Sequence, residues 1–249
     1  EMADLNSELV AVTSSASGSV ITLTLPGGRL SALAARALTD ACLELRENES
    51  ARVVVLRTAD KDFCSSLEDG FDSTSIVPDP ATALASLRVP VVGVIQGACF
   101  SGGLEIALCC DIRIGDSTTS FCMNEPSEGA LPMWGGTQRL PRAISVSRAT
   151  SMLMLGTEVD AVTAQSWNLM HILSEDPEEE VRKVINELLE CGPLALEMAK
   201  EAVHRGSELP LRDGLRLEGD LNHQLAATDD RAEGLAAFFE KRPPDFSGR

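Results

Sequence analysis

The feature that most constrains the fold is an alternation of short apolar runs with helix-forming segments in the first half of the chain. Residues 19–25 (SVITLTL), 51–58 (ARVVVLRT) and 89–97 (VPVVGVIQG) are short and rich in β-branched side chains, as strands are. The last two are apolar almost throughout, which is typical of parallel strands covered on both faces. Residues 30–48, which lie between the first and the second of these runs, carry apolar side chains at helical spacing. We therefore expect a mostly parallel sheet covered by helices.

The pattern changes after residue 141. Before that point, residues 111–116 (DIRIGD) and 120–125 (SFCMNE) resemble two further buried strands. Beyond it, helix-like segments follow one another: RAISVSRATSMLML, TAQSWNLM, EEEVRKVINELLE, LALEMAKEAVHR and RAEGLAAFFEKR. The segment WNLMHIL has room for one short extra strand. We expect an α/β core over residues 1–190, continuous with a helical C-terminal region over residues 191–249.

Charge and hydropathy exclude several classes of protein. The net charge is −17, and no cluster of lysines and arginines offers the basic face that a nucleic-acid-binding protein needs. No apolar run approaches the ~20 residues that span a bilayer. The first residues, EMADLNSELVAV, lack the features of a secretory signal or a transit peptide. We expect a cytoplasmic protein without nucleic-acid or membrane partners, and the start at Glu1 rather than Met leaves an upstream segment open.

Most of the seven cysteines lie in apolar runs, as small buried apolar residues would. They form no CxxC pair and have no metal-type spacing, and their odd number argues against a disulfide framework. The three histidines are scattered and lie near no cysteine in the sequence. We expect no metal site.

The first candidate for chemistry is the run Ser101-Gly102-Gly103-Leu104-Glu105, which follows a buried strand and opens a helix. Glycines there let the backbone turn sharply and approach a ligand, and the free N–H groups favour negative charge. Glu105 in the first helical turn has a plain structural explanation, since an acid there interacts well with the helix dipole. However, the helix continues as Ile-Ala-Leu-Cys-Cys, apolar nearly all round, and a buried carboxylate needs a partner or a purpose.

The second candidate is Glu125, which ends an apolar stretch and precedes a segment rich in proline and glycine. Edges of this kind are where α/β proteins place groups that contact ligands. A solvated loop acid explains Glu125 equally well when it is considered alone.

The two stretches together carry a resemblance. IQGACFSGGLEIALCCDIRI, followed by SFCMNEPSEGALPMWGGTQRLPR, closely resembles the enoyl-CoA hydratase (crotonase) family. The flanks at residues 61–69, 147–170 and 228–246 resemble it too, so that the likeness covers residues 19–246. It implies a crotonase-like (ββα) superhelix core with a helical C-terminal region. It also implies an acyl-thioester of coenzyme A as substrate, with no cofactor besides the coenzyme A that the substrate carries.

The resemblance also implies roles for particular residues. Glu105 and Glu125 match the family's two catalytic glutamates. Gly102 matches the glycine whose N–H forms half of an oxyanion hole, and Leu67 falls where the other N–H donor lies. By family analogy, Glu105 activates the water that attacks C3 and Glu125 protonates C2.

Further residues are implied to bind coenzyme A. Backbone around Cys64, Ser65, Ser66 and Glu68 would receive the adenine, and Arg29 would approach the phosphates. Lys200, Phe239 and Lys241 would help at the nucleotide end, the last two across a subunit boundary. Family members commonly form trimers or pairs of trimers, so we expect a homo-oligomer of that kind.

The sequence departs from the family at four places. The first oxyanion segment reads Ser65-Ser66-Leu67-Glu68 where Ala-Gly-Ala-Asp is usual, and losing the glycine restricts the turn. The stretch from Glu68 to Val89, which helps to shape the acyl pocket, is several residues shorter. Glu128 adds an acid that could compete with Glu125. Asn168 replaces a glycine, a change that we expect to be harmless because asparagine tolerates the left-handed conformation.

Hydration of a 2-enoyl-CoA is the leading hypothesis because both glutamates are present, whereas isomerases of this fold typically keep only the second. A hydratase for a cyclic or polyketide-type acyl thioester fits the altered pocket too. A serine hydrolase using Ser101 is a different possibility, although G-x-S-x-G is absent since Cys99 stands at its first position. The departures at Ser66 and Leu67 also leave open a catalytically idle acyl-CoA-binding protein.

Overall fold

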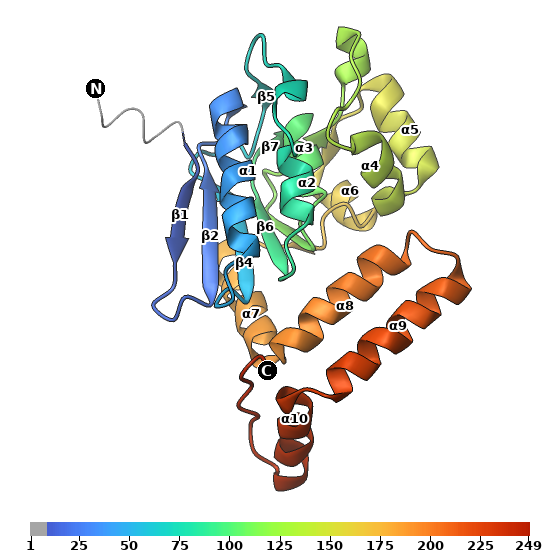
Figure 1. The fold of residues 1–249 in the computed structure, drawn as a ribbon. Helices are drawn as coiled ribbons and strands as arrows, with labels where there is room; N and C mark the ends of the chain where they lie inside the picture. The colour runs from blue at the N-terminus through green and yellow to red at the C-terminus, as the bar shows by residue number, and fades with distance from the viewer. Residues whose placement is uncertain (1–8) are drawn as a thin grey trace. The chain divides into compact units, whose positions relative to one another are not determined.

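A computed structural model describes residues 9–249 (Figure 1). The chain divides into two compact units. The first contains the described residues up to Leu87 together with Val91–Val181, and the second contains Arg88–Pro90 together with Arg182–Arg249. The division lies within a helix, whereas the sequence analysis placed a boundary after residue 190. Each unit is described by itself.

The first unit is built on a six-stranded sheet in the order β1-β2-β4-β6-β8-β11. Its strands are β1 (Ala11–Ser14), β2 (Val20–Leu25), β4 (Val53–Thr58), β6 (Val91–Ile95), β8 (Ile112–Gly115) and β11 (Ile172–Leu173). β1 pairs antiparallel with β2, and every other pair is parallel. All five residues of β6 are buried, as a parallel strand covered on both faces requires. The predicted parallel sheet is therefore confirmed, including the short strand within WNLMHIL.

Two smaller sheets lie beside the site described below. One has the order β10-β9-β7, formed by β10 (Val159–Asp160), β9 (Ser120–Cys122) and β7 (Ala98–Phe100), and the other pairs β3 (Arg29–Leu30) with β5 (Ser66–Leu67). The strand predicted over residues 120–125 is thus wrong in extent, since it ends at Cys122. Pro126 has no N–H to donate to a neighbouring strand, and the chain turns into the 3-10 helix η3 (Glu125–Glu128) instead.

The helices of the first unit lie across the sheet and beside it (Figure 1). They are α1 (Ala32–Arg46), α2 (Pro80–Ala85), α3 (Gly102–Ala107), α4 (Gly136–Ile144), α5 (Val146–Leu155) and α6 (Ala161–Ser166), with the 3-10 helix η2 (Ser73–Ser75). α1 begins where predicted because the Ser31 hydroxyl accepts the N–H of Ala34 at 3.0 Å. The helix predicted over residues 142–155 is instead divided between α4 and α5, since Ser145 has a φ of 85°.

The second unit is helical, as predicted. It contains most of α7 (Pro177–Glu190) and all of α8 (Pro193–Gly206), α9 (Leu211–Ala226) and α10 (Asp229–Glu240). α8 and α9 lie side by side (Figure 1). The sequence analysis did not predict α9, because Gly214 and Gly219 interrupt it and lower its helix propensity. After α10 the chain folds back, and the N–H groups of Ser247 and Gly248 donate to the buried Asp230 carboxylate.

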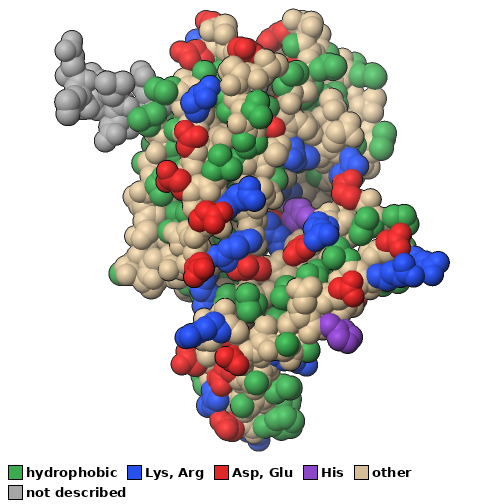
Figure 2. All heavy atoms as spheres, in the orientation of Figure 1, with side chains coloured by type: hydrophobic (Ala, Val, Ile, Leu, Met, Phe, Trp, Pro, Cys, Tyr) green, Lys and Arg blue, Asp and Glu red, His purple; other side chains and the backbone are tan. Residues whose placement is uncertain are grey.

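The burial of the cysteines follows the expectation from the sequence. Six of the seven cysteines are buried as free thiols, and only Cys191 is exposed. Acidic and basic side chains are mixed over the face drawn in Figure 2. Among residues 9–249, no helix has both the length and the apolar character needed to cross a membrane.

Candidate active site

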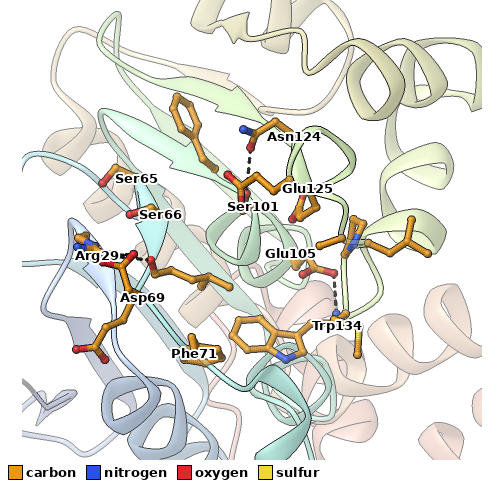
Figure 3. A pocket seen from close by; sticks show the side chains of 18 of the residues that line it. Arg29, Ser65, Ser66, Asp69, Phe71, Ser101, Glu105, Asn124, Glu125 and Trp134 are labelled. Atoms are coloured by element: carbon orange, nitrogen blue, oxygen red, sulfur yellow. Dashed lines mark hydrogen bonds and ion pairs between the residues drawn. The ribbon is translucent and has the colours of Figure 1, made fainter.

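A cavity of about 510 Å³ lies in the first unit, beside the N-terminus of α3 (Figure 3). Three stretches of chain contribute to its lining: residues 65–71, residues 100–105 and residues 124–134. Arg29 lies next to the first of them. The cavity therefore brings together segments that are far apart in the sequence, and both glutamates singled out above face it.

The turn that the sequence predicts before α3 is present and tightly packed. Ser101 has a φ of 49°, which non-glycine residues seldom adopt, and its N–H donates to the carbonyl of Cys122 at 2.9 Å. A Cβ atom on Gly102 would lie 2.8 Å from the Trp134 ring, and one on Gly103 would lie 2.3 Å from the Cβ of Cys64. Close packing, rather than a positive φ, therefore requires glycine at both positions.

Glu105 is held inside the protein. It lies in the first turn of α3 and is only 2% exposed. Its Oε1 accepts the N–H of Trp134 at 2.8 Å and the N–H of Gly136 at 2.7 Å. Burial raises the pKa of Glu105 to about 7, with a smaller contribution from the charge of Glu125, although the two N–H donors oppose the shift. Glu105 is thus a partnered, buried carboxyl that titrates near neutral pH.

Glu125 faces the same cavity from a different kind of element. It opens η3 and is half-buried, and its Oε2 is buried with no hydrogen-bond partner. Burial raises the pKa of Glu125 and the charge of Glu128 raises it further, while a hydrogen bond from Ser101 opposes them. A solvated loop acid would have none of these features, so that simpler explanation of Glu125 is wrong.

Of the two predicted backbone donors, Leu67 lines the cavity and Gly102 lies directly behind the Leu67 side chain. Leu67 ends strand β5, which pairs with β3, and its Cδ2 would lie 2.9 Å from a Cβ placed on Gly102. Gly102 is the first residue of α3, so its N–H has no carbonyl partner within the helix. Ser66 and Leu67 are in extended strand, a conformation that any residue adopts, so this segment does not need the glycine that the family usually has.

The predicted adenine and phosphate contacts divide into cavity residues and buried support. Ser65, Ser66 and Glu68 line the cavity. Cys64 is buried behind them, its carbonyl accepts the N–H of Phe100 at 2.8 Å, and burial raises the pKa of its thiol to about 11. Arg29 is exposed at the edge, where its guanidinium forms an ion pair with Asp69 at 2.7 Å.

Three further predicted residues belong to the second unit and are not among those that line the cavity. Lys200 Nζ donates to the carbonyl of Val89 at 2.8 Å, within the same unit. Phe239 is 78% exposed, and Lys241 is the C-cap of α10, with a φ of 57°. Their predicted contacts with the nucleotide stay predictions.

The sequence analysis missed an aromatic pair in the site. Trp134 is 2% exposed, and its ring meets that of Phe71 edge to face, with centroids 5.6 Å apart. Trp134 stands within the quoted segment that resembles the family, but nothing in the sequence signals its contact with Phe71. Asn124 was also missed; its side-chain oxygen accepts the Ser101 hydroxyl at 3.4 Å.

The described residues that line the cavity do not provide the groups that a serine hydrolase needs. Within the described part of the chain, no histidine is among the residues that line it, which leaves Ser101 without the usual base of a serine hydrolase. No group of three or more His, Cys, Asp or Glu side chains among residues 9–249 is arranged to hold a metal ion.

Comparison with known proteins decides the family. The model of the enoyl-CoA hydratase/isomerase family matches residues 15–249. The chain belongs to this family. It is 32% identical over 228 residues to the bovine "Enoyl-CoA hydratase domain-containing protein 2, mitochondrial", a match that covers 85% of this chain and 77% of that protein. It is 40% identical over 171 residues to the mouse "Methylglutaconyl-CoA hydratase, mitochondrial", covering 66% and 54% of the two chains.

Solved structures agree with the sequence comparison. The crystal structure of an enoyl-CoA hydratase from Bacillus anthracis superimposes with a TM-score of 0.87 at 29% identity, covering 96% of this chain and 99% of that one. A crystal structure from Streptomyces coelicolor A3(2) superimposes with a TM-score of 0.88 at 26% identity. The predicted crotonase-like fold is therefore confirmed, and the protein is an enzyme of the enoyl-CoA hydratase type.

Proposed function

We propose that the protein hydrates the double bond of a 2-enoyl-CoA thioester to give a 3-hydroxyacyl-CoA, and that it catalyses the reverse dehydration. One observation carries this proposal. Two carboxyl groups with raised pKa values, Glu105 and Glu125, face the cavity that Leu67 lines, and Gly102 lies directly behind the Leu67 and Trp134 side chains of its wall. Hydration needs a base and an acid on one substrate, and carboxyls whose environments perturb their pKa values are candidates for both roles.

The reaction uses these groups in sequence. Glu105 takes a proton from water as the water oxygen bonds to C3, and the electron pair of the double bond moves onto the thioester oxygen as an enolate. The N–H groups of Gly102 and Leu67 stabilise that charge, and one donor of this kind contributes about 3–4 kcal/mol. Glu125 then gives its proton to C2 as the enolate collapses, which balances the addition of one water.

The division of roles follows the family resemblance, and the environments of the two carboxyls are compatible with it. Glu105 Oε1 accepts two N–H donors, which favour the ionised form that a base requires. Its pKa of about 7 leaves a large fraction ionised at neutral pH. Glu125 has a buried oxygen without a partner, and burial favours the protonated form that an acid requires.

Coenzyme A enters as part of the substrate, and the reaction requires no other cofactor. In this proposal Arg29 approaches the phosphates, and the backbone from Cys64 to Glu68 receives the adenine. Lys200, Phe239 and Lys241 would complete the nucleotide site, the last two from a neighbouring subunit of a homotrimer or a dimer of trimers. A cytoplasmic location stays a prediction.

The test is loss of the conjugated absorbance of straight-chain, branched and cyclic enoyl-CoA thioesters. Glu105→Gln and Glu125→Gln should each lower kcat by about 10²–10⁴-fold, the usual contribution of a general acid or base, while binding of a saturated acyl-CoA is retained. Glu128→Gln is the matched comparison, since it makes the same change three residues from Glu125 and should keep activity.

Two outcomes would contradict the proposal. Hydration that persists in both Glu105→Gln and Glu125→Gln would remove the two glutamates from the mechanism. A wild-type protein that is silent with every 2-enoyl-CoA, but that moves the double bond of a 3-enoyl-CoA, would be an isomerase.

A further inference from the structure

Trp134 has two roles in the site: its backbone N–H holds the Glu105 carboxyl, and its side chain forms part of the cavity wall. Its N–H donates to Glu105 Oε1 at 2.8 Å, and its carbonyl accepts the Arg139 guanidinium at 2.5 Å. Both sides of its backbone are therefore fixed. The indole extends from this anchored position along the cavity, below Glu105 in Figure 3.

The indole is packed on two sides. On one side it presses against Gly102, where an added Cβ would lie 2.8 Å from Cζ3 and 3.3 Å from Cε3. On the other side it meets Phe71 edge to face, with ring planes at 73°. Phe71 lies in the shortened stretch between Glu68 and Val89. A Trp134 ring held between these neighbours has little room to swing out of the cavity.

The proposed reaction places the acyl group next to this ring. The thioester oxygen is held at Gly102, and water adds to C3 at the Glu105 carboxylate. Trp134 touches both of these reference points, through its ring and through its N–H. The substituent on C3 therefore begins beside the indole, which limits the space available for it.

We propose that Trp134, supported by Phe71, sets the upper size limit of the acyl group and confines the enzyme to short acyl chains. This inference rests on the proposed hydration for the placement of C3. The two aromatic rings act on substrate size alone, since neither is needed to move a proton.

The experiment measures kcat/KM for straight-chain substrates from crotonyl-CoA to dodecenoyl-CoA. The kcat/KM of the wild-type enzyme should fall steeply as the acyl chain lengthens, because one methylene that a pocket does not accommodate changes kcat/KM by about 10–200-fold. Trp134→Ala should raise the ratio of dodecenoyl-CoA to crotonyl-CoA turnover by about ten-fold or more. Phe71→Ala should raise the same ratio by a smaller factor, because the indole loses its support but remains.

Trp167→Ala is the matched control. It makes the same truncation outside the residues that line the cavity, where the Trp167 ring lies under the Arg148 guanidinium at 5.0 Å. The chain-length ratio should stay at its wild-type value in this variant. Should Trp134→Ala fail to fold, Phe71→Ala decides the matter, because it removes the support of the indole while leaving the buried Trp134 side chain in place.

A second measurement separates this inference from the proposed function. Dissociation constants of butyryl-CoA and decanoyl-CoA should show the same size limit, and the same relief in Trp134→Ala, without any catalysis. Absence of hydration in wild type would overturn the proposed function only. Equal use or binding of short and long chains by wild type, or a ratio unchanged in both Trp134→Ala and Phe71→Ala, would overturn the size limit.

Discussion

Glu105 and Glu125 face one cavity but are held in opposite ways. Glu105 lies on a helix, is almost completely buried, and has one oxygen bonded to two backbone N–H groups. Glu125 opens a short 3-10 turn, is half-buried, and has a buried oxygen with no partner. The pKa of each is raised mainly by burial, and hydrogen bonds oppose the shift at both residues: from the backbone N–H groups of Trp134 and Gly136 at Glu105, and from Ser101 at Glu125.

The two glutamates differ in whether the surrounding backbone supplies hydrogen bonds to the buried carboxyl oxygen. At Glu105 the fold fixes the position of the carboxyl and pairs one oxygen with two N–H groups, so the residue should contribute to stability as well as to activity. At Glu125 one buried oxygen has no hydrogen-bond partner, and the residue should contribute to activity at a cost in stability. Such a conflict between stability and activity is common where a site must keep a group in an unfavourable environment.

The largest expected effect concerns stability when each side chain is removed. Glu105→Ala leaves the N–H groups of Trp134 and Gly136 buried without an acceptor, at about 1–3 kcal/mol each. Glu105→Gln keeps an oxygen acceptor and should lose less. Glu125→Ala should change the free energy of unfolding by no more than about 0.5 kcal/mol, or increase it. Urea denaturation of the three variants measures these differences, and equal losses at the two positions would abolish the contrast.

A second prediction concerns the pH dependence of stability. The pKa of Glu105 rises from 4.5 to about 7 on folding, so the folded protein holds a proton that the unfolded chain releases within this window. Stability from this group is therefore complete below pH 4.5 and is lost as the pH rises to about 7, in total about 3 kcal/mol. The difference in unfolding free energy between wild type and Glu105→Gln, measured across this window, should follow that slope. A flat difference would contradict the raised pKa.

The smallest expected effect sharpens the account of Glu125. The charge of Glu128 helps to raise the pKa of Glu125, so Glu128→Gln should lower that pKa. An acid loses its proton as the pH rises through its pKa, and the alkaline decline of kcat should therefore move to lower pH. The shift should be small because Glu128 is exposed and its charge is screened. A pH–rate profile measures it, and movement toward higher pH would be inconsistent with Glu125 as the acid.

Much of the framework followed from local patterns. The runs around β2, β4, β6 and β8 predicted the parallel sheet because strands buried on both faces must be apolar throughout. The replacement of a glycine by Asn168 was expected to be tolerated, and Asn168 has a φ of 63°. These features depend on side chains near one another in the chain, which a sequence displays directly.

Other features depended on contacts between distant residues. The missed helix α9 forms despite Gly214 and Gly219, since packing beside α8 outweighs their low propensity. The strand expected through Glu125 ended early because Pro126 could not pair. Phe71 and Trp134 stand far apart in the sequence, and only the folded chain brings their rings together.

The sequence by itself determined the parallel sheet, the tight turn into α3 and the two glutamates in their motifs, because strand burial, glycine packing and the order of residues are local properties. Only the tertiary structure decided that both glutamates face one cavity, that Glu105 has backbone donors and Glu125 lacks a partner for one oxygen, and that an indole limits the space beside them. The reason is physical: desolvation, hydrogen bonding and steric room at a group depend on every atom around it, and most of those atoms come from distant parts of the chain.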